Sequence, residues 1–217
     1  MRIALVNPNT SDETTERMVE IAAKAAGPDV TIAGFTAGFG VPLITEPHAL
    51  DVSTDAVAVL ARVLEGFDAV IVSAFGDPGV QALRDRLEIP VTGIAEAAMA
   101  EAGAGGRRFA VVTTTPDLAP RIADTAAGLG HAGFAGTWTT SGDAAALLAD
   151  PAALQKALRT AIARAVAEAE VIAVVIGGGP LAMAARALAG QSPVPLIEPV
   201  PSAVRLTFSR LGLEVCV

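Results

Sequence analysis

Residues 68–80 read Asp-Ala-Val-Ile-Val-Ser-Ala-Phe-Gly-Asp-Pro-Gly-Val, and the rest of the chain is organised around this stretch. The apolar run 69–72 lies between turn-forming residues, which predicts a buried strand. Asp77 and Pro78 predict a helix start, because Asp is a good N-cap and Pro fits the first helical turn. A strand that passes through small residues into a helix presents unpaired N–H groups, which suits an anion. The alternative is an ordinary strand–helix turn of an α/β domain.

Composition indicates the type of core and excludes several classes of partner. Of 217 residues, 52% are hydrophobic but only 4% aromatic, which suits parallel strands under Ala-rich helices. With a net charge of −8, the chain offers no basic surface for nucleic acid. Its single cysteine, Cys216, allows no internal disulfide and no Cys-based zinc site, so we expect no metal.

The sequence also predicts a cytoplasmic location without a membrane span. Residues 1–8 have the pattern of a strand and not of a signal peptide. The most apolar stretch, 171–189, is interrupted by three glycines, Pro180 and Arg186, so it is not expected to cross a membrane.

Hydrophobic periodicity predicts alternating strands and helices along the whole chain. The strands are expected over 2–6, 30–35, 68–72, 91–94, 108–112, 133–139, 171–176, 194–197 and 213–217, and the main helices over 12–26, 49–65, 77–87, 96–102, 116–129, 151–168, 180–188 and 202–211. This alternation is typical of parallel α/β folds.

The second half of the chain repeats the first. Asn-Pro-Asn-Thr at 7–10 corresponds to Thr-Thr-Thr-Pro at 113–116, and Phe-Gly-Asp-Pro-Gly at 75–79 corresponds to Gly-Gly-Gly-Pro-Leu at 177–181. A third pair starts at Pro90 and at Pro195, and the three separations are 106, 102 and 105 residues. We therefore expect two pseudo-symmetric, Rossmann-like α/β lobes with mostly parallel sheets.

The repeat also predicts where the lobes divide and where a ligand binds. The first lobe is expected to comprise 1–103 and 203–217, and the second 104–202, with Gly-Ala-Gly-Gly at 103–106 as a hinge. Ligands of open parallel sheets bind beyond the carboxyl ends of the strands. The two sets of turns should therefore face each other across an active-site cleft between the lobes.

The stretches 7–10 and 75–79 carry a resemblance to a known family. Together they resemble the aspartate/glutamate/hydantoin racemases, and most closely the branch of the hydantoin and allantoin racemases. The resemblance covers essentially the whole chain. It implies a cofactor-independent isomerase of two α/β lobes, in which one cysteine removes the Cα proton and a second delivers a proton to the opposite face. At the level of the family, it also implies a homo-oligomer.

The chain departs from that family where the two catalytic cysteines stand. The first cysteine of the family precedes Phe-Gly-Asp-Pro-Gly, and this position is Ala74 here. The second lies in a Gly-Cys turn after the late strand, and this position is Gly178. Neither residue can carry a proton. Ser73 is adjacent to Ala74, but its side chain is expected on the other face of the strand.

The other residues that the family resemblance implies for the substrate pocket are present in this sequence. The residues expected to bind the substrate are Asn7, Asn9, Ser73, Ala74, Phe75, Gly76, Asp77, Thr114, Thr115, Gly178, Gly179 and Pro180. Several have a simpler reading as helix caps, among them Asn9 and the threonines at 113–115. Asp77 in particular is expected to cap its own helix, with a pKa lowered by that contact.

Three further residues are weak candidates for a replacement acid or base. Glu96 and Glu198 follow matching strands and form a symmetric carboxylate pair, although favourable charges at helix starts explain them as well. His48 ends a loop rich in Gly, Pro and Thr over 36–47, whereas His131 has no such context. The stretch 177–182 also fits a Gly-x-Gly-x-x-Ala dinucleotide fingerprint weakly, because Pro180 interrupts the turn.

Two functions follow from these observations. One is an isomerase that acts on a hydantoin-like or carboxylate derivative of an amino acid by Cα proton transfer, or by related carbanion chemistry, without the cysteine pair. The other is a non-catalytic paralogue that binds such a molecule. In both cases the partner is a small anionic or cyclic-amide ligand, without a cofactor.

Overall fold

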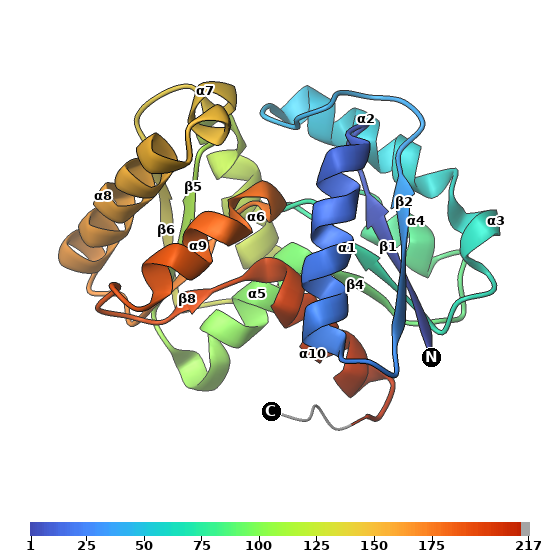
Figure 1. Ribbon diagram of the computed structural model, residues 1–217. Coiled ribbons are helices and arrows are strands. Elements are labelled where there is room, and N and C mark those ends of the chain that lie inside the picture. Colours follow the sequence, from blue (N-terminus) through green and yellow to red (C-terminus); the bar gives the residue numbers. More distant parts are fainter. Residues whose placement is uncertain (214–217) are drawn as a thin grey trace.

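Two four-stranded parallel sheets form the centre of the protein, one in each half of the chain (Figure 1). The computed structural model describes residues 1–213. The predicted strand over 213–217, with Cys216, lies outside the described residues except for Leu213.

The first sheet has the strand order β2-β1-β3-β4. Its strands are β1 (Arg2–Asn7), β2 (Thr31–Thr36), β3 (Ala69–Val72) and β4 (Val91–Gly93), and its helices are α1 (Asp12–Ala26), α2 (Pro47–Ala58), α3 (Ala61–Leu64), α4 (Val80–Arg84) and α5 (Ile94–Ala102). The central strands β1 and β3 are covered on both faces, which explains their nearly continuous apolar runs.

The second sheet repeats this order as β6-β5-β7-β8, with all its strands parallel. Its strands are β5 (Phe109–Thr113), β6 (Phe134–Thr139), β7 (Ala173–Ile176) and β8 (Leu196–Ile197). Its helices are the short 3-10 turns η1 (Ala104–Gly106), η2 (Pro116–Leu118) and η3 (Gly179–Leu181), together with α6 (Ala119–Gly128), α7 (Ala144–Ala149), α8 (Pro151–Ala169), α9 (Ala182–Ala189) and α10 (Pro199–Arg210). The predicted α/β class and internal repeat are confirmed.

Two helices cross between the lobes in a reciprocal way. The helix α5 follows the first sheet but packs against β7, β8 and α6 of the second. The helix α10 follows the second sheet but packs against α1, β3 and β4 of the first. Because α5 and α10 also pack against each other, the two helices join the lobes at the centre of the molecule (Figure 1).

Some boundaries differ from the sequence-based expectations. The predicted helix over 49–65 is divided into α2 and α3, and α4 begins at Val80, not at Asp77. Residues 76–79 form a turn instead, in which Gly76, Asp77 and Gly79 have positive φ angles of 110°, 53° and 78°. A left-handed conformation at these positions is incompatible with a helix, so the helix starts after the turn.

Candidate functional site

A cleft lies between the lobes at the carboxyl ends of the strands, with an empty volume of about 620 Å³ that is partly open to solvent. Nine of the predicted binding residues line it: Asn9, Ser73, Ala74, Phe75, Thr114, Thr115, Gly178, Gly179 and Pro180. Asn7, Gly76 and Asp77 do not line it. The cleft therefore contains both Ala74 and Gly178, the two positions at which the family resemblance implies a cysteine.

The first lobe contributes an asparagine that has free hydrogen-bonding capacity. Asn7 is fully buried, and its amide nitrogen donates to Asn9 Oδ1 at 2.8 Å and to Thr15 Oγ1 at 2.9 Å. Asn9 Oδ1 also accepts the Ser11 N–H at 2.9 Å, so the oxygen of its amide faces the loop. Among residues 1–213, the Asn9 Nδ2 group donates to no protein acceptor and is left for the cleft. Asn7 therefore orients Asn9 and does not itself face the cleft.

The second lobe repeats this arrangement with hydroxyl groups. Thr113 Oγ1 and Thr115 Oγ1 lie 2.9 Å apart, as the side chains of Asn7 and Asn9 pair in the first lobe. Thr114 lies between them, is 4% exposed and lines the cleft. Its hydroxyl makes no hydrogen bond within the described part of the chain. The hydroxyl is not among the buried polar atoms that lack a partner, so it is accessible from the cleft and can donate to or accept from a ligand.

The two turns that contain Ala74 and Gly178 meet at the base of the cleft. A Cβ atom on Gly177 would lie 3.3 Å from Phe75 Cε1, and one on Gly179 would lie 3.6 Å from the Ser73 carbonyl oxygen. The turns predicted to face each other are therefore close together. Gly178 has a φ of +155°, and a Cβ atom there would lie 3.3 Å from the Leu181 side chain.

The first of these turns also presents free backbone donors. The N–H of Ser73 donates to Val6 O and that of Asp77 to Ala74 O, but the three N–H groups between them have no acceptor among residues 1–213. The Ser73 hydroxyl is not free, because it donates to Val6 O at 2.9 Å. The cleft is therefore rich in neutral donors.

The sequence reasoning missed the apolar wall of the cleft. Its members are Leu43 and Ile44 from the loop before α2, Leu118 and Ile122 from η2 and α6, and Leu148 from α7. The only sequence signal for any part of this wall is the Gly, Pro and Thr content of the loop over 36–47, which contains Leu43 and Ile44. The other leucines and isoleucines have the spacing of ordinary helix cores, so no sequence signal distinguishes them.

The structure corrects the expected role of Asp77. Its carboxylate does not cap α4 but accepts two N–H groups at the start of α5, from Ala95 at 2.8 Å and from Glu96 at 2.7 Å. Part of the residue borders a second, open groove, but the carboxylate lies against Gly93, where a Cβ atom would be 2.1 Å from Asp77 Cγ. Burial raises the pKa of Asp77 to about 7, which outweighs the lowering effect of the two N–H groups. The expected lowering of this pKa is wrong.

Glu96 is held in an ion-pair network and does not line the cleft. Its carboxylate accepts from Arg84 at 2.8 Å and from Arg210 at 2.5 Å, which joins α4, α5 and α10. Burial alone raises the pKa of Glu96, but the hydrogen bonds and charges of the two arginines outweigh it, so the pKa is lowered. Glu96 is thus an ionised structural residue and not a poised base.

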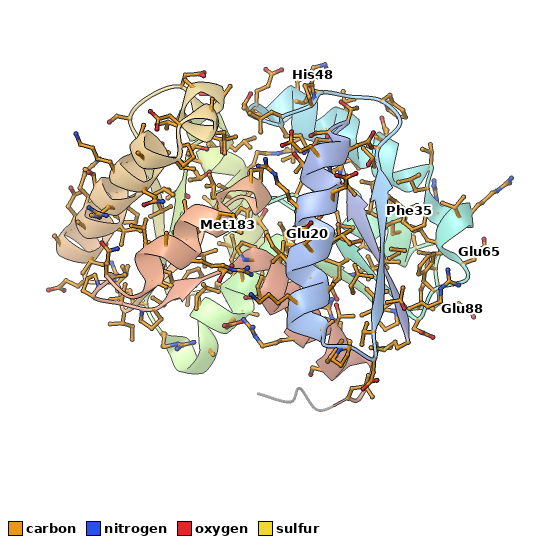
Figure 2. The ribbon with its side chains drawn as sticks, viewed as in Figure 1. Glu20, Phe35, His48, Glu65, Glu88 and Met183 are labelled. Carbon is orange, nitrogen blue, oxygen red and sulfur yellow. The ribbon has the colours of Figure 1, made fainter. Side chains whose placement is uncertain are left out.

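The other candidate acids and bases lie away from the cleft as well. Glu198 pairs with Arg186 at 2.8 Å, which repeats the pairing of Arg84 with Glu96 in the first lobe. His48 is exposed at the start of α2, on the rim of the first lobe (Figure 2). His131 packs edge-on against Phe109, and burial lowers its pKa. Glu96 and Glu198 therefore occupy equivalent positions as partners in ion pairs, and not as an acid–base pair in the cleft.

Comparison with known proteins agrees with this architecture. The family model "Asp/Glu/Hydantoin racemase" matches residues 3–207. A hydantoin racemase from Pseudomonas sp. (strain NS671) is 30% identical over 98% of this chain and 87% of its own length. Structures of allantoin racemases from Klebsiella pneumoniae and Pseudomonas fluorescens are each 32% identical over 99% of this chain. The aligned regions cover 90% and 93% of the two solved chains, with TM-scores of 0.89 and 0.88.

The two parallel sheets and the cleft between them thus define an α/β protein with the architecture of these racemases. The chain belongs to the aspartate/glutamate/hydantoin racemase family. Over residues 1–213, no group of three His, Cys, Asp or Glu side chains is placed to hold a metal ion. In the same part of the chain, the helices are too short or too polar to span a membrane.

Proposed function

We propose that this member of the family binds a small cyclic amide between its lobes and does not racemise it. The observation that carries the proposal is the lining of the cleft, because none of the described residues that line it has an ionisable side chain. Racemisation at Cα needs an acid or base on each face of the carbon. Ala74 and Gly178 stand where the family pattern has thiols, and Glu96 is engaged in ion pairs.

The polar groups of the cleft suit an uncharged ligand with carbonyl oxygens. The Asn9 amide and the Thr114 hydroxyl approach from opposite lobes, and the backbone N–H groups near Ala74 add further donors. A buried ionised group without a charged partner is strongly unfavourable, and no cation or anion of the described residues lines this cleft. The names of the hydantoin and allantoin racemases support a ring with two carbonyl groups.

The apolar wall of the cleft favours a ligand that also carries an aliphatic substituent. Leu43 and Ile44 approach from the first lobe, and Leu148 approaches from the second. Because burial of apolar surface contributes about 25 cal/mol per Å², an aliphatic substituent that contacts this wall is favoured over a polar one. The proposed ligand is therefore a hydantoin-like ring with an aliphatic side chain, and binding through these contacts requires no cofactor.

Two experiments test binding and catalysis separately. Titration calorimetry with 5-isobutylhydantoin, allantoin and aspartate should give the tightest binding for the first. Proton NMR in deuterated water should show no exchange of the C5 hydrogen beyond the protein-free rate. Exchange well above that rate would overturn the non-catalytic assignment, and tighter binding of aspartate would instead favour a carboxylate ligand.

Matched variants test the assignment of the cleft. Thr114→Val removes the unpaired hydroxyl and is expected to weaken binding about tenfold, as for one good hydrogen bond. Thr160→Val is the control, because its hydroxyl donates to Lys156 O on the exposed face of α8, away from the cleft. Equal affinities for the two variants would show that the ligand does not use Thr114.

Catalysis should be gained by restoring both thiols. The pKa of a cysteine thiol, ordinarily about 8.5, is readily lowered at the start of a helix, and both turns lead into a helix. The double variant Ala74→Cys/Gly178→Cys is expected to exchange the C5 hydrogen and racemise the probe. Each single variant should do much less, because one face of the carbon then has no acid or base.

A further inference from the structure

The carboxylate of Asp77 makes a contact that neither the cleft nor the family pattern explains. It reaches across 18 residues of sequence to accept the Ala95 N–H, and its other oxygen accepts the Glu96 N–H. These are two of the free N–H groups at the start of α5. The N-cap residue of α5 is Gly93, which has no side chain of its own to accept them. Asp77 therefore supplies the missing cap from another element.

The geometry of both partners is adapted to this contact. Asp77 has a φ of +53°, a left-handed conformation that is uncommon for residues other than glycine and that aspartate tolerates better than most. Gly93 leaves the space that the carboxylate fills, since a Cβ atom there would lie 2.1 Å from Asp77 Cγ. This left-handed conformation directs the Asp77 carboxylate away from α4, and the two hydrogen bonds to α5 hold it there.

The contact joins the ligand-binding turn to the helix that crosses between the lobes. Ala74 and Phe75 line the cleft, and Asp77 follows them in the same turn, where its N–H donates to Ala74 O at 3.0 Å. At the other end, α5 packs against the second sheet and against α10. The Asp77 carboxylate is therefore the only side chain of residues 73–79 that hydrogen-bonds the start of α5 within the described chain.

The second lobe has no equivalent clamp. The turn that follows β7, residues 177–181, reads Gly-Gly-Gly-Pro-Leu and contains no carboxylate. The helix α10, which corresponds to α5, begins with Pro199 and contains Pro201. These prolines carry no N–H group, so the start of α10 needs fewer acceptors. Within residues 1–213, a side chain therefore fixes the first-lobe turn to the central helix pair, and no side chain of the turn 177–181 does the same.

We propose that Asp77 is a positioning residue of the ligand site, which clamps the turn 73–79 onto the start of α5 and so sets ligand affinity from outside the cleft. This inference rests on the proposed function for its ligand. The ionised carboxylate holds both N–H groups, whereas the protonated form keeps one acceptor oxygen and turns the other into a donor. Loss of the clamp releases Ala74 and its free neighbouring donors from their fixed positions.

Affinity should therefore depend on pH although the cleft has no titrating group among its described residues. Burial raises the pKa of Asp77 to about 7. The charged groups near its carboxylate are Glu96 of α5, Arg84 of α4 and, through Glu96, Arg210 of α10. Arg121 and Asp124 of α6 border the adjoining groove, and Arg121 pairs with Asp51 of α2. Affinity for a neutral probe should fall as the pH drops through about 7.

The test measures the Kd for 5-isobutylhydantoin between pH 5.5 and 8.5. Wild-type protein should bind about tenfold more tightly at the upper end, and Asp77→Asn should bind weakly at every pH. Asp68→Asn is the matched control, because Asp68 accepts the Arg2 N–H at 2.7 Å at the opposite end of β3. His48→Gln tests whether the histidine on the rim accounts for the profile. Tight binding by Asp77→Asn at pH 8, or a pH dependence that disappears with His48→Gln, would overturn the proposal.

A second measurement uses wild-type protein alone, without a ligand and without a variant. The backbone amide NMR signals of Ala95 and Glu96 should titrate with the Asp77 carboxylate in wild-type protein, and those of Ala74, Phe75 and Gly76 should follow with the same midpoint. If the probe does not bind but all five signals titrate together, the proposed function fails and the clamp stands. If the signals of the turn do not follow those of α5, the clamp itself is refuted.

Discussion

The pH dependence of stability offers a sharp test of the buried Asp77 carboxylate. Its pKa is raised from 3.8 to about 7 in the folded protein, mainly by burial. A raised pKa means that the folded state binds the proton more tightly than the unfolded state. The free energy of unfolding is then reduced progressively as the pH rises from about 4 to about 7.

The magnitude follows from the size of the change in pKa. At about 1.4 kcal/mol per pH unit, the ionised carboxylate lowers the free energy of unfolding by about 4 kcal/mol above pH 7. The variant Asp77→Asn carries a neutral amide at every pH and escapes this penalty. Between pH 5 and pH 8, its stability relative to wild type should therefore increase by about 3 kcal/mol.

Urea unfolding of both proteins at four pH values measures this difference. The contribution of Glu96 has the opposite sign, because its pKa is lowered, but it is present in both proteins and largely cancels. The result expected is a variant that becomes more stable relative to wild type as the pH rises while it binds the probe less tightly. A stability difference that does not change with pH would refute the buried, near-neutral titration of Asp77.

Five further outcomes are expected. Gly93→Ala should weaken probe binding as Asp77→Asn does, because its Cβ atom displaces the carboxylate, and calorimetry measures this. Glu96→Gln should lower the free energy of unfolding by about 2–3 kcal/mol in urea, since its carboxylate is buried and pairs with two arginines. Glu198→Gln, with a single and more exposed pair, should lower it by less than about 1 kcal/mol. Gly178→Ala should lower it by about 1–3 kcal/mol because of its positive φ, and equal melting temperatures would contradict this. Alkylation of Cys216, the only thiol, should leave probe binding unchanged.

Much of the fold could be predicted from local sequence patterns. The apolar run 69–72 and its counterpart 173–176 are buried on both faces, and such strands are recognisable without knowledge of their partners. The repeat at a separation of about half the chain predicted two similar lobes, and both sheets have the same strand order. The end of the helix over 12–26 was also predictable, because Gly27 and Pro28 are a typical helix stop, and Gly27 takes a positive φ of 84° at the C-cap.

The candidate site was predictable where it depends on backbone turns. Parallel strands end at the same edge of a sheet, so the stretches after β1 and β3 were expected to lie together, as were those after β5 and β7. The internal repeat then predicted that the two sets face each other across a cleft. The absence of thiols at Ala74 and Gly178 is a property of the sequence alone. These two facts are enough to expect a ligand pocket without the acid–base pair that the family resemblance implies.

Only the tertiary structure decided which partner each polar side chain has. Asp77 was expected to cap the nearest helix, but the left-handed turn delays α4 to Val80 and directs the carboxylate to α5. Glu96 meets Arg210, which lies 114 residues away on a helix that crosses from the other lobe. Local propensity describes contacts within a few residues, whereas capping between elements and ion pairing depend on how distant segments pack. The sequence by itself therefore determined the lobes and the missing thiols, and packing determined whether each acidic residue is a cap, an ion-pair partner or a titrating group.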